Sequence, residues 1–113
     1  MSLDIDLITN KCEHCGRYDV AYSANTTHNL ADMAKEADIY ECLWHPERCS
    51  VTKAGQLISP LTKAVLAMKK DPDRFKAHNS PNGWGMYRNF LPWLENLLGA
   101  CHNHPDAEIE VSV

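Results

Sequence analysis

Apolar and polar side chains alternate in two short segments of the chain. In residues 18–24, Tyr18, Val20 and Tyr22 alternate with smaller or polar residues, which is the period-two pattern of a half-buried β-strand. Residues 107–113, with the sequence AEIEVSV, alternate in the same way. We therefore predict one strand near the beginning of the chain and a second strand at its end.

Between these strands, apolar residues recur at the three- and four-residue spacing of an α-helix. The segments with this pattern are residues 30–44, with a break at Asp38, residues 60–70 and residues 84–101. Asn29 is a suitable N-cap for the first helix, and Ser59 followed by Pro60 marks the start of the second. Pro92 lies inside the third segment and is expected to kink that helix.

Two strands with three helices between them predict an α+β fold. We expect a small single domain in which three helices pack on a short antiparallel sheet formed by the N- and C-terminal strands. The predicted organisation is an N-terminal arm with a metal knuckle over residues 1–17, followed by an α+β domain over residues 18–113. Because a two-stranded sheet is marginal by itself, we also expect a homo-oligomer in which the sheet continues into a second subunit.

Length and charge exclude several classes of function. A chain of 113 residues has room for one modest hydrophobic core. Its formal net charge of -4 argues against non-specific binding of nucleic acid or anionic lipid, because both require a basic surface. No apolar run is long enough to span a membrane, and the acidic residues near the N-terminus do not fit a signal peptide. We therefore expect no membrane partner and a cytoplasmic location.

The five cysteines point to metal chemistry rather than to disulfides, since their number is odd and no secretion signal precedes them. Cys12, Cys15 and the following glycine form a C-x2-C-G knuckle, which is half of a zinc site. His45 and Cys49 have a suitable spacing for the other half, and the predicted ligand set for a structural zinc ion is therefore Cys12, Cys15, His45 and Cys49. The alternatives are Cys42 in place of His45, a ligand from His14 or His28, and ordinary buried thiols at Cys42 and Cys101.

Two polar segments precede predicted helices and are candidates for a ligand site. They are Thr27-His28-Asn29 and Asn82-Gly83-Trp84-Gly85. Helix N-termini carry unpaired N–H groups and a partial positive charge, so both segments suit an anion such as phosphate. Trp84 and Tyr87 add flat faces on which a base can stack. The predicted ligand residues are Thr27, His28, Asn29, Asn82, Gly83, Trp84 and Tyr87, and the alternative interpretation is that both segments are simple helix caps with Trp84 in the core.

Signals for catalysis are weak. The chain contains no G-x-S-x-G elbow, no Walker loop and no H-E-x-x-H helix. A hydrolase acting on a phosphorylated or nucleoside substrate, with His28 as acid and base near Asp106 or Glu110, remains an alternative. The residues themselves favour a protein that is not an enzyme.

From Tyr22 to its last residue the chain resembles a family of small proteins encoded by bacteria and their phages. The resemblance rests chiefly on residues 22–30 (YSANTTHNL), 43–47 (LWHPE), 82–87 (NGWGMY) and 104–107 (HPDA). This chain departs from the family at Thr26, Asp38, His45, Cys49 and Val113. The appearance of His45 and Cys49 together with the N-terminal cysteines favours the four-ligand zinc set. The resemblance implies a phage or mobile-element accessory protein and brings no established reaction with it.

These observations lead to one main hypothesis and two alternatives. The main hypothesis is an oligomeric binding module that holds an anionic, nucleotide-like ligand and sequesters a host defence signal in the host cytoplasm. The first alternative is the hydrolase described above. The second is a zinc-stabilised adaptor that binds another protein through Trp44, Trp93 or the edge of the terminal strand.

Overall fold

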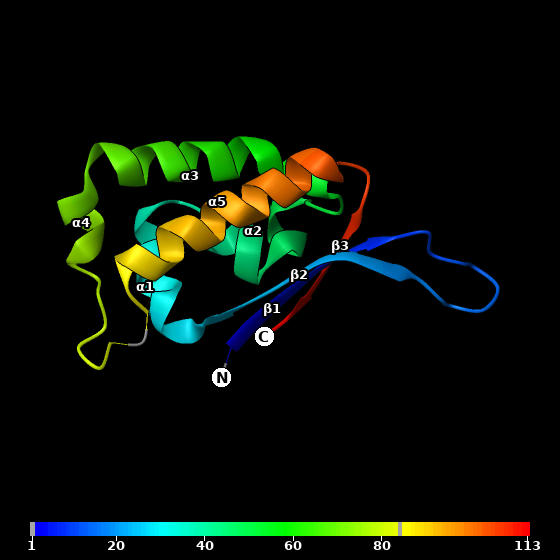
Figure 1. Cartoon of the computed structure of the whole chain (residues 1–113), viewed down its shortest axis with the longest axis horizontal. Helices are drawn as coiled ribbons and strands as arrows, with labels where there is room; N and C mark the ends of the chain where they lie inside the picture. The colour runs from blue at the N-terminus through cyan, green and yellow to red at the C-terminus, as the bar shows by residue number, and fades with distance from the viewer. Residues whose placement is uncertain (1, 84) are drawn as a thin grey trace.

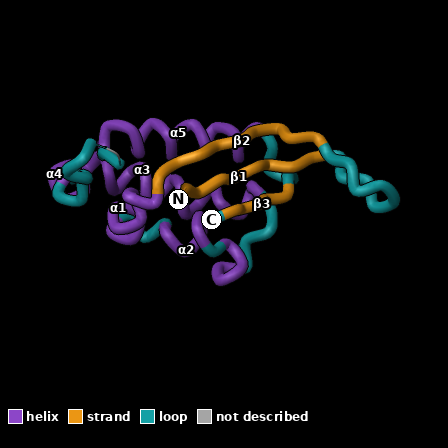
Figure 2. Tube along the Cα trace, turned by 90° about the horizontal axis from the view of Figure 1, so that it is seen from below, coloured by secondary structure: helices purple, strands orange, loops and turns teal. Residues whose placement is uncertain are grey.

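A computed structural model describes residues 2–83 and 85–113, and within them three strands form one antiparallel sheet. The strands are β1 (Ser2–Thr9), β2 (Asp19–Thr27) and β3 (Glu108–Ser112). Their order is β2-β1-β3, so the N-terminal strand lies between the other two (Figures 1 and 2). The predicted α+β class is confirmed, and both predicted strands exist with boundaries close to those expected.

The pairing of the strands corrects one part of the prediction. Residues 2–9, which we assigned to an arm, form the central strand, so β2 and β3 pair with β1 instead of with each other. In β1 the side chains of Leu3, Ile5 and Leu7 are fully buried, whereas Asp4 is exposed and Asp6 only half-buried on the opposite face. This alternation is itself a strand pattern. We expected the sheet to continue into a second subunit because two strands alone are marginal. Since the chain supplies its own third strand, this argument no longer applies.

Helices connect β2 to β3. They are η1 (His28–Leu30), α1 (Ala31–Glu36), α2 (Tyr40–Trp44), η2 (Pro46–Cys49), η3 (Ala54–Leu57), α3 (Ile58–Lys70), α4 (Pro72–Lys76) and α5 (Tyr87–Asn103). The predicted break at Asp38 is confirmed, because that residue has a φ of 59° and separates α1 from α2. Two predicted caps are wrong. Ser59 lies within α3, which continues directly from η3, and Asn29 lies within η1, where Thr27 is the N-cap.

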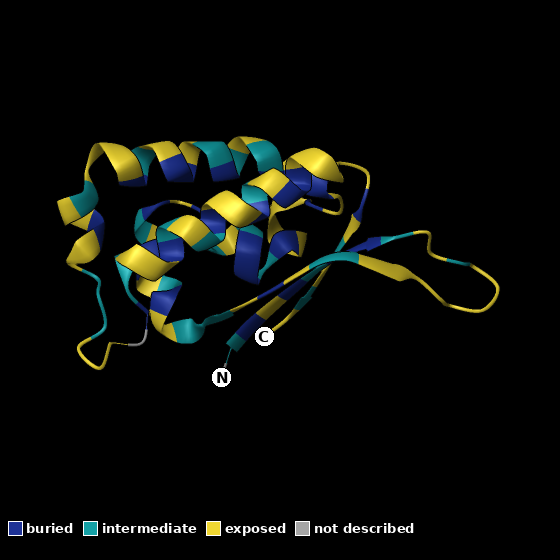
Figure 3. Ribbon diagram, in the orientation of Figure 1, coloured by how far each residue is buried: buried dark blue, intermediate teal, exposed yellow. Residues whose placement is uncertain are grey.

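The hydrophobic core lies between the sheet and the helices. Figure 1 shows the helices on one side of the sheet, with α3 and α5 next to each other, and the buried stripes of these two helices face inward (Figure 3). Phe75 and Phe90 are the largest fully buried side chains. The hydroxyl of Tyr87 donates to the carbonyl oxygen of Met68 at 2.8 Å and so joins α5 to α3.

The loop between β1 and β2 extends beyond the helices in both ribbon views (Figures 1 and 2). This loop, residues 10–18, contains the C-x2-C-G knuckle. The molecule is therefore elongated, with extents of 48 × 27 × 22 Å. Among the described helices, none has both the length and the apolar character needed to cross a lipid bilayer.

Candidate functional site

The first candidate segment of the ligand site, Thr27-His28-Asn29, begins at the last residue of β2. The chain turns there into η1, and the hydroxyl of Thr27 accepts a hydrogen bond from the backbone N–H of Asn29 at 3.2 Å. Thr27 therefore stabilises the turn itself. The turn places His28 at the junction of the sheet and the helices, and α1 begins immediately after it.

His28 is held by a tryptophan from α2. The indole N–H of Trp44 donates to Nδ1 of His28 at 2.9 Å, so the proton of the neutral imidazole is on Nε2. This Nε2 atom is buried and has no hydrogen-bond partner within the described residues. A buried polar group without a partner costs about 1–3 kcal/mol. Trp44 is itself only 3% exposed, so the interpretation of Trp44 as a surface residue for protein binding is wrong.

The second candidate segment contacts the first one through Gly85. A Cβ atom on Gly85 would lie 2.9 Å from Cβ of Asn29 and 3.2 Å from its carbonyl carbon. These separations are too short for any side chain other than glycine's hydrogen. Gly85 also has a φ of +103°, which side-chain-bearing residues rarely adopt. The two segments singled out in the sequence are therefore in direct contact, although more than fifty residues separate them.

The loop before α5 has its own hydrogen bonds. The Oδ1 atom of Asn79 accepts the N–H of Tyr87 at 2.7 Å, so Asn79 satisfies the first N–H of α5. The hydroxyl of Ser80 donates to Oδ1 of Asn82 at 2.6 Å, and the N–H of Gly83 donates to the carbonyl of Ser80 at 3.1 Å. Asn82 and Gly83 are exposed. Trp84, the predicted stacking residue, lies outside the described residues.

An open cavity of about 500 Å³ lies between η1 and the segment 77–81. Its lining consists of His28, Asn29, Ala31, Asp32, Ala77, His78, Asn79, Ser80 and Pro81. The structure thus brings His28 and Asn29 together with a polar loop that sequence reasoning treated only as a connection. The Asn-Ser-Pro run at residues 79–81, three turn-forming residues before a long helix, is the signal that marked this loop. The hydroxyl of Tyr87 points instead toward α3.

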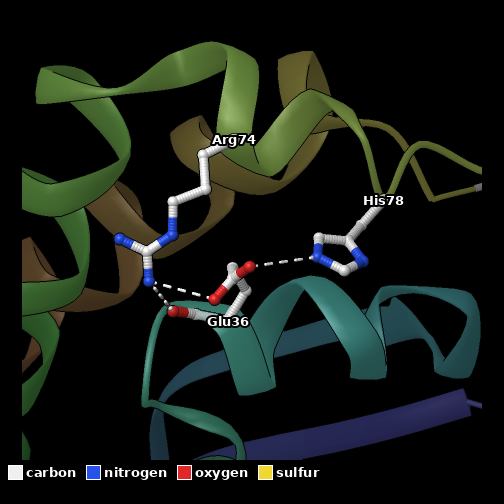
Figure 4. Close-up of polar contacts among 3 residues, drawn as sticks. All are labelled: Glu36, Arg74 and His78. Carbon is white, nitrogen blue, oxygen red and sulfur yellow. Dashed lines mark hydrogen bonds and ion pairs between the residues drawn. The ribbon is translucent and has the colours of Figure 1, made fainter.

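Glu36, Arg74 and His78 form a group of polar contacts (Figure 4), and His78 also lines this cavity. Arg74 on α4 donates through Nη2 to Oε2 of Glu36 at 3.0 Å and to the carbonyl oxygen of Glu36 at 3.2 Å. Nε2 of His78 lies 3.5 Å from Oε1 of the same carboxylate. The hydrogen bonds from Arg74 and then His78 lower the pKa of Glu36, and the pKa of Arg74 is raised by the same contact. Glu36 therefore links α1 to α4 and positions His78 at the cavity.

The thiols of Cys12 and Cys15 meet in the loop between β1 and β2. The side chain of Cys15 hydrogen-bonds the Cys12 sulfur, and so do the backbone N–H groups of Cys15 and His14, which lowers the pKa of Cys12. The turn is closed by the N–H of Gly16, which donates to the carbonyl of Cys12 at 2.8 Å. Gly16 adopts a φ of +71°, as the tight turn requires.

A second pair of thiols lies at α2 and η2. The Sγ atoms of Cys42 and Cys49 are 3.0 Å apart, and burial, followed by the hydrogen bond to Cys49, raises the pKa of Cys42 to about 12. His45 does not join this pair, since its Nδ1 lies 3.6 Å from a carboxylate oxygen of Glu47. The four predicted zinc ligands are thus not gathered into one cluster. Within residues 2–83 and 85–113, no group of three or more potential metal ligands is found.

No family model, curated protein or solved structure matches this chain. The inference of function therefore depends on the cavity and the side chains described above. Their most specific feature is the contact between Asn29 and Gly85, because it joins the two segments from which the sequence predicted a ligand site.

Proposed function

We propose that this chain is a non-catalytic binding module for a small anionic, nucleotide-like ligand. The ligand would occupy the cavity between η1 and residues 77–81. The observation that carries the proposal is the contact of Asn29 with Gly85, which holds the two predicted segments against each other. Asn29 also lines the cavity, whereas Asn82, Gly83 and Tyr87 do not.

The size and the polar groups of the cavity support a ligand of this class. A volume of about 500 Å³ falls within the usual range for small-molecule sites. Size alone does not select this cavity, because another open cavity, of about 630 Å³, lies between residues 46–53 and β3. The polar groups of the smaller cavity support the choice: two imidazoles, two amide side chains and a hydroxyl line it. Such groups hydrogen-bond phosphate oxygens and base edges without a strongly basic surface.

Among the described residues that line the cavity, Asp32 carries the carboxylate, and this negative charge restricts the orientation of the ligand. A carboxylate repels phosphate but accepts hydrogen bonds from ribose hydroxyls or from an exocyclic amine. We therefore place the sugar or base of the ligand toward Asp32 and its phosphate toward His28. In this orientation the phosphate lies next to His28, which lines the cavity.

Binding without turnover suits the role that the resemblance to phage-encoded proteins implies. A protein that sequesters a signal needs affinity and abundance rather than turnover. We propose that the chain acts in the host cytoplasm as a phage or mobile-element accessory protein that removes a nucleotide signal of host defence. This role rests on analogy with the family that it resembles.

Thermal unfolding with added ligands tests the proposal. A ligand present at one hundred times its dissociation constant adds about 2.7 kcal/mol to the free energy of unfolding, which is a readily measured shift in Tm. The panel pairs cyclic, linear and nicotinamide-containing nucleotides with their nucleosides, so that the contribution of phosphate is measured directly. Folded protein whose Tm is unchanged by the whole panel would contradict the proposal.

Two variants connect any shift to this cavity. His28→Ala is expected to lose most of the ligand-induced shift, because it removes the imidazole from the lining. His102→Ala is the matched control, since His102 is an exposed histidine near the end of α5, and it should retain the full shift. Chromatography of the nucleotides after long incubation separates binding from hydrolysis: recovery of unchanged ligand supports a binding module, and appearance of product supports the hydrolase.

A further inference from the structure

The cysteines form two thiol pairs that lie in different parts of the molecule. Cys12 and Cys15 are in the loop that extends beyond the helices (Figures 1 and 2), whereas Cys42 is in α2 and Cys49 ends η2. The described residues contain no cluster in which a third ligand joins either pair. A closed structural zinc site takes four ligands, so each pair is half of such a site.

We propose that Zn²⁺ is bound between two copies of this chain, by Cys12 and Cys15 of one copy and Cys42 and Cys49 of the other. The same arrangement repeated in the opposite direction gives a symmetric dimer with two zinc ions. The zinc site is then incomplete in a single chain and complete only at the interface. This inference is independent of the ligand cavity and of the function proposed for it.

The loop pair has the local geometry of a metal knuckle. Cys12 and Cys15 have the C-x2-C-G spacing of such a knuckle, and the N–H of Gly16 closes the turn between them by donating to the carbonyl of Cys12 at 2.8 Å. Cys15 is exposed, and the loop around it projects away from the helices. A second molecule can therefore approach both sulfurs from outside.

The second pair is Cys42 with Cys49, and not His45 with Cys49. The 3.0 Å between the two sulfurs is longer than a disulfide bond of about 2.05 Å. It is shorter than the separation of about 3.8 Å that follows from two tetrahedral Zn–S bonds of about 2.3 Å. Rotation of the exposed Cys49 side chain opens this distance without movement of α2. His45, by contrast, faces Glu47 and the ring of Tyr40.

Zinc content of three full-length variants tests the arrangement. Elemental analysis of wild-type protein, purified without chelator, should give one zinc per chain. The double variants Cys12→Ser/Cys15→Ser and Cys42→Ser/Cys49→Ser should each lose the metal when purified alone. Cys101→Ala is the control, because Cys101 is the buried thiol outside both pairs, and it should retain one zinc per chain. Circular dichroism establishes that each variant is folded.

Mixing the two double variants is the decisive measurement. In a mixed dimer one interface has four cysteines and the other has none, so an equimolar mixture should recover half of the wild-type zinc per chain. Co²⁺ should give the absorption bands of tetrahedral thiolate coordination in that mixture and in neither variant alone. If all four ligands came from one chain, the mixture would bind no metal, and the proposal would be overturned.

Two further outcomes overturn the proposal. If the knuckles of two copies share one ion, Cys42→Ser/Cys49→Ser keeps half a zinc per chain. If Cys42 and Cys49 form a disulfide instead, reduced and unreduced wild-type protein differ by the mass of two hydrogens and zinc is absent. Light scattering gives the assembly directly: the proposal requires a dimer that chelator converts to monomers, and a monomer with bound zinc contradicts it.

Discussion

Replacing Gly85 by alanine tests the contact between the two segments that the sequence marked as candidates for a ligand site. The added methyl would lie 2.9 Å from Cβ of Asn29, and overpacking of this kind costs about 1–3 kcal/mol. The φ of +103° at this position adds about 1–3 kcal/mol for a residue with a side chain. We therefore expect Gly85→Ala to lower the free energy of unfolding by about 2–6 kcal/mol.

Gly83→Ala separates the two contributions to this loss. Gly83 also has a positive φ, of +78°, but a Cβ atom there meets nothing within 4 Å. This control should lose only the backbone part, about 1–3 kcal/mol. Urea unfolding at equilibrium, followed by tryptophan fluorescence, measures both values, and the excess loss in Gly85→Ala is the energy of the contact.

A third variant identifies the neighbour that the methyl strikes. Asn29→Gly removes the Cβ atom at 2.9 Å, so in the Gly85→Ala background it should recover part of the lost stability. Equal losses in Gly85→Ala and Gly83→Ala, with no recovery by Asn29→Gly, would refute the contact. The proposed site would then lose its main support.

Two further predictions follow from the shifted pKa values. The pKa of Glu36 is lowered, so its contact with Arg74 stabilises the fold above the ordinary carboxyl pKa, and this contribution is lost as pH falls through the folded-state pKa. Urea unfolding from neutral to acidic pH should therefore show a steeper loss of unfolding free energy for wild type than for Glu36→Gln. Equal slopes would contradict the ion pair. In metal-free protein, iodoacetamide should modify Cys12 first, because its pKa is lowered, and modify Cys42 and Cys101 last, because theirs are raised to about 12 and about 11. Peptide mass spectrometry over time measures this order, and early loss of the Cys42 thiol would refute it.

The predicted elements depended on patterns within a few residues of each other. Period-two alternation located β2 and β3, helical spacing located α1, α3 and α5, and Asp38 marked a real break. The alternation of Leu3, Ile5 and Leu7 with aspartates has the same period of two, and it lies within the segment predicted to be an arm. The sequence of these residues does not indicate that they form the middle strand, because that position depends on pairing with β2 on one side and β3 on the other.

The caps show where local preference is overridden. Ser59-Pro60 is a favourable helix start in isolation, but η3 already supplies helical backbone before it, so Ser59 is inside the helix. Asn79 satisfies the first N–H of α5 across an intervening loop. An eight-residue separation of this kind cannot be found from N-cap preferences, which describe neighbours in sequence.

The amino-acid sequence by itself determined the fold class and most of the elements, and it supplied the candidate residues for binding a ligand or a metal. It determined these because propensity, periodicity and ligand spacing act over one or two turns of the chain. Only the tertiary structure decided which candidates meet: Asn29 with Gly85, Trp44 with His28, and Cys42 with Cys49 while Cys12 and Cys15 remain in the outer loop. These contacts depend on the path of the whole backbone, because burial of apolar side chains in the core brings together segments that are distant in sequence.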